Sequence, residues 1–159
     1  MIKALKYIGV CALLFLIIQT TRMYFSGAKI PDYNYLGLDG KSHTNGELPK
    51  TPIIFIYFST SCGFCEKVII ELKKIHKGNK NINYVFVTNE KSQETINDFV
   101  KKNRVLELTS SIFIDDKDSF PMDFGLGMAY STPTILTYNN NGVFIKKINN
   151  FEDIKLLKF

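Results

Sequence analysis

The 159-residue chain contains no tryptophan, only two histidines and only three cysteines. A structural zinc site needs four ligands, and His43 and His76 show no paired ligand spacing with the cysteines. The chain also lacks internal repeats and low-complexity tracts, and its 45% hydrophobic and 22% charged residues are typical of a globular domain. We therefore expect a folded domain without a bound metal.

Acidic residues are absent from the first 28 positions, where Lys3, Lys6 and Arg22 are the only charged side chains. The rest of the chain holds 17 basic and 15 acidic residues, so it contributes only +2 of the total charge of +5. A nearly balanced charge over this part gives no argument for nucleic-acid binding, and we expect no nucleic-acid partner.

The same N-terminal stretch predicts a membrane anchor. Fifteen uncharged residues separate Lys6 from Arg22, and a helix over residues 5–25 approaches the thickness of the hydrocarbon core, which is about 30 Å. Cleavage of a signal peptide after the small residues Ser26-Gly27-Ala28 is the alternative outcome. The favoured prediction is an uncleaved anchor.

The domain organisation follows from this anchor. We expect residues 1–28 to be a transmembrane segment with its linker and residues 29–159 to form one domain. Basic residues precede the apolar run, which places the N-terminus in the cytoplasm. The domain is then expected on the periplasmic side of the inner membrane, where disulfides persist.

Two cysteines form the motif Cys62-Gly63-Phe64-Cys65, which closely follows the apolar run 53–58. A run of this kind is typical of a buried strand, and the residues after the motif have helical apolar spacing. A thiol at the start of a helix lies among unpaired backbone N–H groups, which favours the thiolate. Cys65 lies one turn further along, within reach of Cys62. The motif therefore predicts a redox-active dithiol.

Strand and helix patterns alternate along the rest of the chain. We expect strands at 33–36, 42–44, 53–59, 83–88, 111–115, 134–138 and 143–148, and helices at 62–77, 92–103 and 151–159, with a turn or short helix at 120–127. This order predicts an α/β protein with helices packed around a mixed central sheet.

These elements, in this order around the CxxC motif, resemble the thioredoxin fold. Residues 30–159 resemble most the membrane-anchored TlpA/ResA-type thiol–disulfide oxidoreductases of the thioredoxin-like superfamily. The likeness rests on a hairpin around Asp39-Gly40, on the CxxC motif, and on Ser131-Thr132-Pro133-Thr134. It implies a thioredoxin fold that is extended by an N-terminal β-hairpin.

The resemblance also implies roles for four residues. Cys62 is the attacking thiol, and Cys65 resolves the mixed disulfide that forms with a substrate. Pro133 is a cis-proline that faces the two sulfurs, and Thr132 offers its backbone to the substrate chain. The resemblance implies no cofactor besides the redox-active Cys62–Cys65 disulfide.

The chain departs from the family pattern at four positions, one of which is Ile70, where the family often has a helix-kinking proline. Ser61 stands where the family commonly has tryptophan. Ile56 and Val68 occupy the positions at which thioredoxins and ResA-like proteins, respectively, carry a carboxylate. The proton acceptor for Cys65 is therefore open, because Glu66, although close in sequence, is typical of a solvated acid in the first turn of a helix.

The favoured function is reduction of disulfides in envelope proteins, with electrons supplied by a membrane or envelope donor. Two alternatives remain. Peroxiredoxins share this fold and carry a hydroxyl three residues before their reactive cysteine, as Ser59 stands before Cys62, although their preceding proline is missing here. A non-catalytic module that binds Cu(I) through its two thiolates is the other.

Overall fold

The computed structural model describes residues 28–128, 130–148 and 151–155. The predicted membrane segment, residues 5–25, lies outside these ranges, as does the end of the helix predicted over 151–159. Within the described ranges, no helix combines the length and the apolar character that crossing a membrane requires.

The described strands form one mixed sheet of seven strands in the order β2-β1-β5-β4-β3-β6-β7. The central strands β3, β4 and β5 are parallel, and β6 joins β3 antiparallel. This confirms the predicted mixed sheet of a thioredoxin-like fold. The strands are β1 (Asn34–Gly37), β2 (Ser42–Thr44), β3 (Ile53–Tyr57), β4 (Asn83–Thr88), β5 (Ile112–Ile114), β6 (Thr134–Tyr138) and β7 (Phe144–Ile148).

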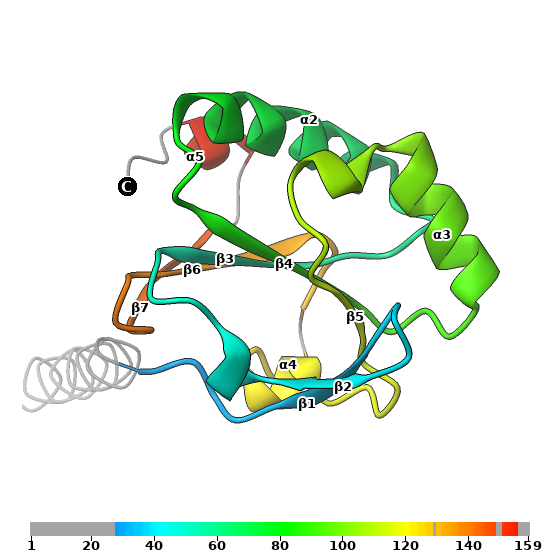
Figure 1. Cartoon of the computed structure of the whole chain (residues 1–159), viewed down its shortest axis with the longest axis horizontal. Coiled ribbons are helices and arrows are strands. Elements are labelled where there is room, and N and C mark those ends of the chain that lie inside the picture. The colour runs from blue at the N-terminus through cyan, green and yellow to red at the C-terminus, as the bar shows by residue number, and fades with distance from the viewer. Residues whose placement is uncertain (1–27, 129, 149–150, 156–159) are drawn as a thin grey trace, which may run out of the picture.

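Helices cover both faces of this sheet (Figure 1). Helices α2, α3 and α5 pack on one face, and the short helix α4 lies on the other. Two 3-10 turns, η1 and η2, were not expected from the sequence. The helices are α2 (Gly63–Gly78), α3 (Gln93–Lys102), α4 (Phe120–Asp123) and α5 (Phe151–Lys155), and the turns are η1 (Asn45–Glu47) and η2 (Val105–Glu107).

The β-hairpin expected at the N-terminal side of the domain is present. β1 pairs with β2 antiparallel, and Gly40 in the turn between them has a φ of +76°, a conformation that glycine adopts without strain. β1 also pairs antiparallel with β5, through Leu36 opposite Ile114. The hairpin thereby extends the central sheet at its β5 edge.

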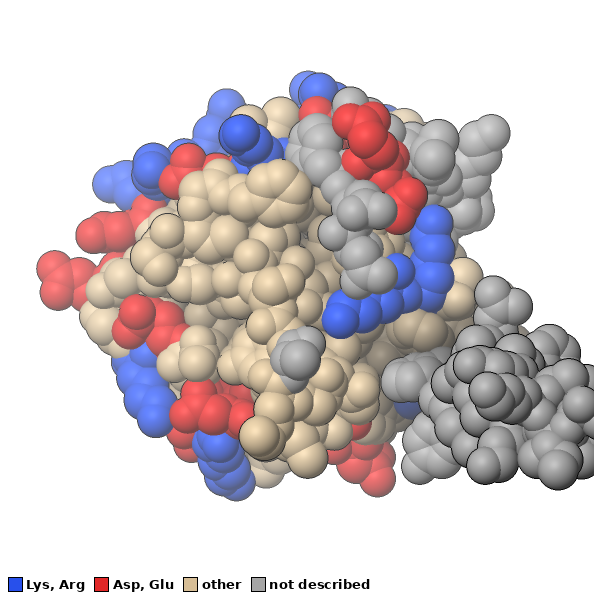
Figure 2. Space-filling view, turned by 180° about the vertical axis from the view of Figure 1, so that it is seen from behind, with Lys and Arg blue, Asp and Glu red and all other residues tan. Residues whose placement is uncertain are grey.

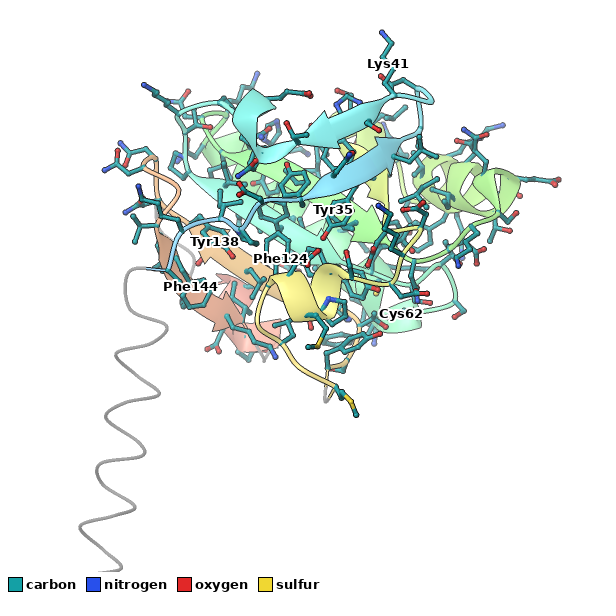
Figure 3. The ribbon with its side chains drawn as sticks, turned by 90° about the horizontal axis from the view of Figure 1, so that it is seen from below. Tyr35, Lys41, Cys62, Phe124, Tyr138 and Phe144 are labelled. Carbon is teal, nitrogen blue, oxygen red and sulfur yellow. The ribbon has the colours of Figure 1, made fainter. Side chains whose placement is uncertain are left out.

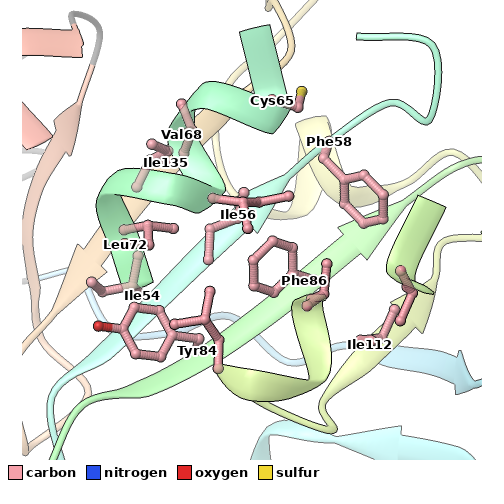
Figure 4. Packing of buried hydrophobic residues seen from close by; sticks show 14 of the residues in the cluster. Ile54, Ile56, Phe58, Cys65, Val68, Leu72, Tyr84, Phe86, Ile112 and Ile135 are labelled. Atoms are coloured by element: carbon pink, nitrogen blue, oxygen red, sulfur yellow. The ribbon is translucent and has the colours of Figure 1, made fainter. Parts of the chain in front are cut away.

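Strand β3 is buried along its whole length, which explains its continuous apolar sequence. Because side chains alternate across a strand, Ile54 and Ile56 pack under α2 (Figure 4), whereas Phe55 and Tyr57 enter a separate cluster on the other face. The strand ends at Tyr57, two residues earlier than predicted. Because β3 is packed on both faces of the sheet, the point at which the loop to the CxxC motif starts is held in place.

The cluster on the α4 face is mainly aromatic. The ring of Phe120 in α4 stacks on Tyr57 with a centroid distance of 4.6 Å and on Phe124 with a distance of 4.1 Å. Asp115 is fully buried and accepts hydrogen bonds from the backbone N–H groups of Ser119 and Phe120 at 2.9 and 2.8 Å. These contacts hold α4 against the end of β3.

Candidate active site

The first cysteine of the motif lies at the junction between β3 and α2. Cys62 has extended backbone angles and is the N-cap of α2, so the helix begins one residue later than predicted. Its Sγ accepts a hydrogen bond from the backbone N–H of Cys65 at 3.1 Å. Cys62 is partly exposed. It is therefore a sulfur that solvent or a substrate can reach, with a helix-terminal N–H directed at it.

The second cysteine lies beneath the first. Cys65 is only 1% exposed and packs in the core with Val68 and Ile69 of α2. Burial, followed by a hydrogen bond with Cys62, raises the pKa of the Cys65 thiol to about 12. The two sulfurs therefore differ in accessibility and in protonation. Cys62 is the accessible one, and Cys65 stays protonated at neutral pH.

A loop from the other end of the chain faces the dithiol. The Thr132–Pro133 peptide bond is cis, as the resemblance implies, and the Cys62 thiol donates to the carbonyl oxygen of Thr132 at 3.5 Å. The loop is held by Thr134, whose hydroxyl donates to the Ser131 carbonyl at 2.7 Å and which is paired with β3 through Tyr57. The structure thus brings all four predicted site residues together.

The two positions at which the family carries a carboxylate hold apolar side chains in this protein. Ile56 and Val68 are both buried and apolar. The Glu66 carboxylate accepts a hydrogen bond from the Lys102 ammonium group of α3 at 2.6 Å, so it ties α2 to α3 at the surface. This surface ion pair agrees with the interpretation of Glu66 as a solvated acid of the first turn.

Sequence reasoning missed a carboxylate that lies beside the loop. Glu90 follows β4, and its Oε2 accepts a hydrogen bond from the Thr60 hydroxyl at 3.4 Å, two residues before Cys62. Its Oε1 accepts from the backbone N–H of Ser92 at 2.9 Å. The sequence predicts strands at 53–59 and 83–88, but no local signal places them side by side; the structure pairs β3 and β4 in parallel, so their carboxyl ends meet at one edge of the sheet. Glu90 is in a position to hold the CxxC loop.

The hydroxyl that suggested a peroxidase is engaged elsewhere. Ser59 Oγ lies 3.0 Å from Ser61 Oγ and accepts a weak hydrogen bond from the Ser61 N–H at 3.4 Å. In the described part of the chain, no hydrogen bond joins Ser59 Oγ to the Cys62 sulfur, which receives the Cys65 N–H instead. The site therefore lacks the hydroxyl–thiol contact that the peroxiredoxin alternative requires.

Both histidines have structural contacts. The His43 ring bonds to Asp39 at 3.1 Å and to Glu47 at 2.9 Å, and His76 packs edge-on against Tyr84 at a centroid distance of 5.6 Å. Among residues 28–128, 130–148 and 151–155, no group of three or more His, Cys, Asp or Glu side chains is arranged to hold a metal ion.

Large apolar side chains are exposed within the CxxC motif and in the segment that precedes the cis-proline loop. Phe64 within the motif is 44% exposed, and Tyr130 and Met128, just before the cis-proline, are 38% and 92% exposed. Figure 2 shows the molecule from behind, with a broad face on which charged side chains are confined mainly to the margins. Phe64 lies between the two cysteines, so an exposed apolar side chain borders the dithiol, which is typical of a surface that contacts another macromolecule.

Solved structures share this fold. The thioredoxin domain of a thiol-disulfide oxidoreductase from Bacteroides vulgatus has 16% identity and a TM-score of 0.68, over 82% of this chain and 93% of that one. A secreted Mycobacterium tuberculosis disulfide oxidoreductase, homologous to E. coli DsbE, has 17% identity and a TM-score of 0.61, over 74% and 83%. A thioredoxin-family thiol:disulfide interchange protein from Chlorobium tepidum has 16% identity and a TM-score of 0.65, over 82% and 94%.

At these identities, the structural likeness shows the thioredoxin fold. No curated relative matches the sequence. The Redoxin family model, in contrast, matches residues 25–155 and so spans both cysteines and the cis-proline loop. This match confirms the expected class, a thioredoxin-like oxidoreductase. The chain belongs to the Redoxin family.

Proposed function

We propose that the protein reduces disulfides in protein clients through the Cys62–Cys65 pair. The observation that carries this proposal is the arrangement of the two sulfurs. A partly exposed sulfur receives a helix-terminal N–H, and a buried thiol follows it one turn along the helix. This asymmetry suits an attacking thiol followed by a resolving thiol.

The reaction transfers two electrons to the client. The Cys62 thiolate attacks one sulfur of the client disulfide, so that a Cys62–client disulfide forms and the other client sulfur leaves as a thiolate. Cys65 then loses its proton and attacks the Cys62 sulfur, which releases the second client thiolate. The protein ends with a Cys62–Cys65 disulfide and the client with two thiols. A dithiol donor in the membrane or envelope must then return two electrons and two protons.

Client binding is proposed to use the loop that faces the dithiol. The Thr132 backbone lies beside Cys62, and an extended client segment can pair with backbone groups there. The exposed side chains of Phe64, within the motif, and of Met128 and Tyr130, in the segment before the cis-proline, offer apolar contacts to the client. Reduction of protein disulfides is further supported by the fold shared with thiol-disulfide oxidoreductases.

The reduction potential of the pair tests this direction of electron flow. Gly63 and Phe64 bring no charge or imidazole next to the sulfurs, so the reduced form is not strongly stabilised. We expect a potential near that of thioredoxin, about −270 mV. Equilibration with dithiothreitol buffers and mass spectrometry of alkylated protein would measure it. Cys11→Ser protein removes the third thiol, and a potential near −120 mV would instead indicate an oxidant.

We also propose that residues 5–25 anchor the domain in the inner membrane, with the dithiol on the periplasmic side. The support is the uncharged run between Lys6 and Arg22 and the stability of disulfides in that compartment. Full-length protein made in a Gram-negative host is expected to stay in the membrane pellet after high-salt and carbonate washes. Recovery of soluble protein that begins at Lys29 would contradict an uncleaved anchor.

A further inference from the structure

A second apolar feature lies apart from the dithiol, on the α4 face of the sheet. It is a cavity of about 400 Å³, a size at which proteins bind small molecules. Figure 3 shows Phe124, Tyr138 and Phe144 on the side of α4 that is remote from Cys62. The apolar walls of the cavity are Pro31, Phe124, Leu126, Leu136, Tyr138 and Phe144.

Contacts between aromatic rings and a hydrogen-bonded turn hold these walls in place. The ring of Tyr138 meets Phe144 edge-on at a centroid distance of 5.6 Å and Phe124 at 6.5 Å. After α4, Gly125 has a φ of +67°, and the Leu126 N–H donates to the Pro121 carbonyl at 2.7 Å. This turn directs the chain along the cavity, so the cavity is formed by hydrogen-bonded backbone and packed rings.

The charges at the cavity favour an anion. Lys29 and Lys147 line it, and neither forms an ion pair within the described residues. Asp123 also lines it, but its Oδ2 is already bonded by the Ser119 hydroxyl at 2.6 Å and the Tyr35 hydroxyl at 3.2 Å. One carboxylate and two ammonium groups thus leave the lining with a net positive charge, and Lys29 and Lys147 are the groups that can meet an anionic ligand.

We propose that this cavity binds a single-chain amphiphile with a carboxylate head, that is, a fatty acid. The alkyl chain lies among the aromatic walls, where each buried methylene group adds to the affinity. The carboxylate lies at Lys29 and Lys147, which supply opposite charge. A neutral apolar ligand would leave both ammonium groups unused, and a cationic one would be repelled by them.

A photoreactive dodecanoic acid with a diazirine group tests the proposal on the purified full chain in phosphatidylcholine nanodiscs. After irradiation, mass spectrometry is expected to find label on the peptides that contain Phe124–Leu126 and Phe144–Lys147. Unlabelled dodecanoate is expected to displace the label at concentrations at least tenfold lower than dodecyltrimethylammonium does. Label confined to residues 1–27 would overturn the proposal, because it would show that the probe reports only the bilayer or the N-terminal segment.

Matched lysine variants test the head-group contact. Lys147→Gln is expected to weaken labelling about threefold, the effect of losing one partly exposed ion pair. Lys146→Gln is the control, because Lys146 is exposed, is adjacent to Lys147 on β7 and does not line the cavity. Equal labelling of the two variants would overturn the carboxylate assignment. Leu126→Trp, checked for an unchanged circular dichroism spectrum, is expected to fill the cavity and remove the label.

Discussion

Replacing Cys65 with serine is expected to convert the protein from a catalyst into a trap that stays joined to its clients through Cys62. The attack by Cys62 does not need Cys65, but release of the client does. In a Cys11→Ser background, turnover of insulin disulfides should fall on the order of 10³-fold. Non-reducing gels and mass spectrometry should show a client covalently bound at Cys62.

The control for this trap is Cys62→Ser, also in the Cys11→Ser background. It is expected to lose turnover and to form no mixed disulfide, because the buried Cys65 thiol cannot reach a client. A trap that forms equally well through Cys65 would contradict the proposed roles of the two sulfurs.

Assays of peroxide consumption separate the dithiol mechanism from peroxide reduction. A peroxidase consumes hydroperoxide rapidly and forms a sulfenic acid at its reactive cysteine. We expect slow peroxide consumption, and we expect Ser59→Ala to leave disulfide reduction unchanged, since the Ser59 hydroxyl bonds to Ser61 rather than to Cys62. Fast peroxide turnover that depends on Ser59, without activity on protein disulfides, would reverse the order of the two hypotheses.

The core of the fold was predictable from local sequence patterns. The apolar run of β3 and the helical spacing after Cys65 place a buried strand directly before an amphipathic helix. Gly78 and Ser92 mark a helix end and a helix start, and Asn139–Gly142 marks the turn between β6 and β7. Each signal concerns residues that are close in sequence, and physical chemistry constrains such residues strongly.

Local sequence patterns do not predict which distant segments of the chain pair with one another. The contact of β1 with β5 joins Leu36 to Ile114, and no short-range signal encodes it. The position of the cis-proline loop against Cys62 was expected only from the resemblance, because 70 residues separate Cys62 from Thr132. The hydrogen bond between Thr60 and Glu90 depends on the neighbouring positions of β3 and β4, which the sequence alone did not establish.

The cavity also depends on contacts between distant segments, so local sequence patterns do not predict it. Its walls come from the start of the domain, from the end of α4 and from two C-terminal strands. The sequence predicts a turn or short helix near Phe124 and two strands that contain Tyr138 and Phe144, but it does not predict that these elements leave space between them. A void depends on how side chains from separate elements fit, so it emerges only when all of them have been placed.

The step that releases the reduced client is expected to accelerate steeply with pH. Burial keeps the pKa of Cys65 well above the ordinary thiol value of about 8.5. Below that raised pKa, the fraction of Cys65 thiolate grows about tenfold for each pH unit, so release should be about 100-fold faster at pH 9 than at pH 7. Rapid mixing of reduced protein with a fluorescent disulfide peptide would resolve the release step from the attack.

The loss of folding stability that accompanies ionisation of Cys65 sets the highest pH at which this experiment can be run. Because folding raises the Cys65 pKa, its contribution to stability is fully present below the ordinary thiol pKa and is lost as pH rises toward the folded value. Measurements up to pH 9 therefore stay where most of this stability remains. Glu66→Gln and Glu90→Gln are the matched controls, since the carboxylates of Glu66 and Glu90 bond to Lys102 and Thr60. We expect both variants to keep the wild-type slope. A flat wild-type profile would contradict release limited by a Cys65 thiol of raised pKa, and a slope altered by either variant would show that its carboxylate accepts the Cys65 proton.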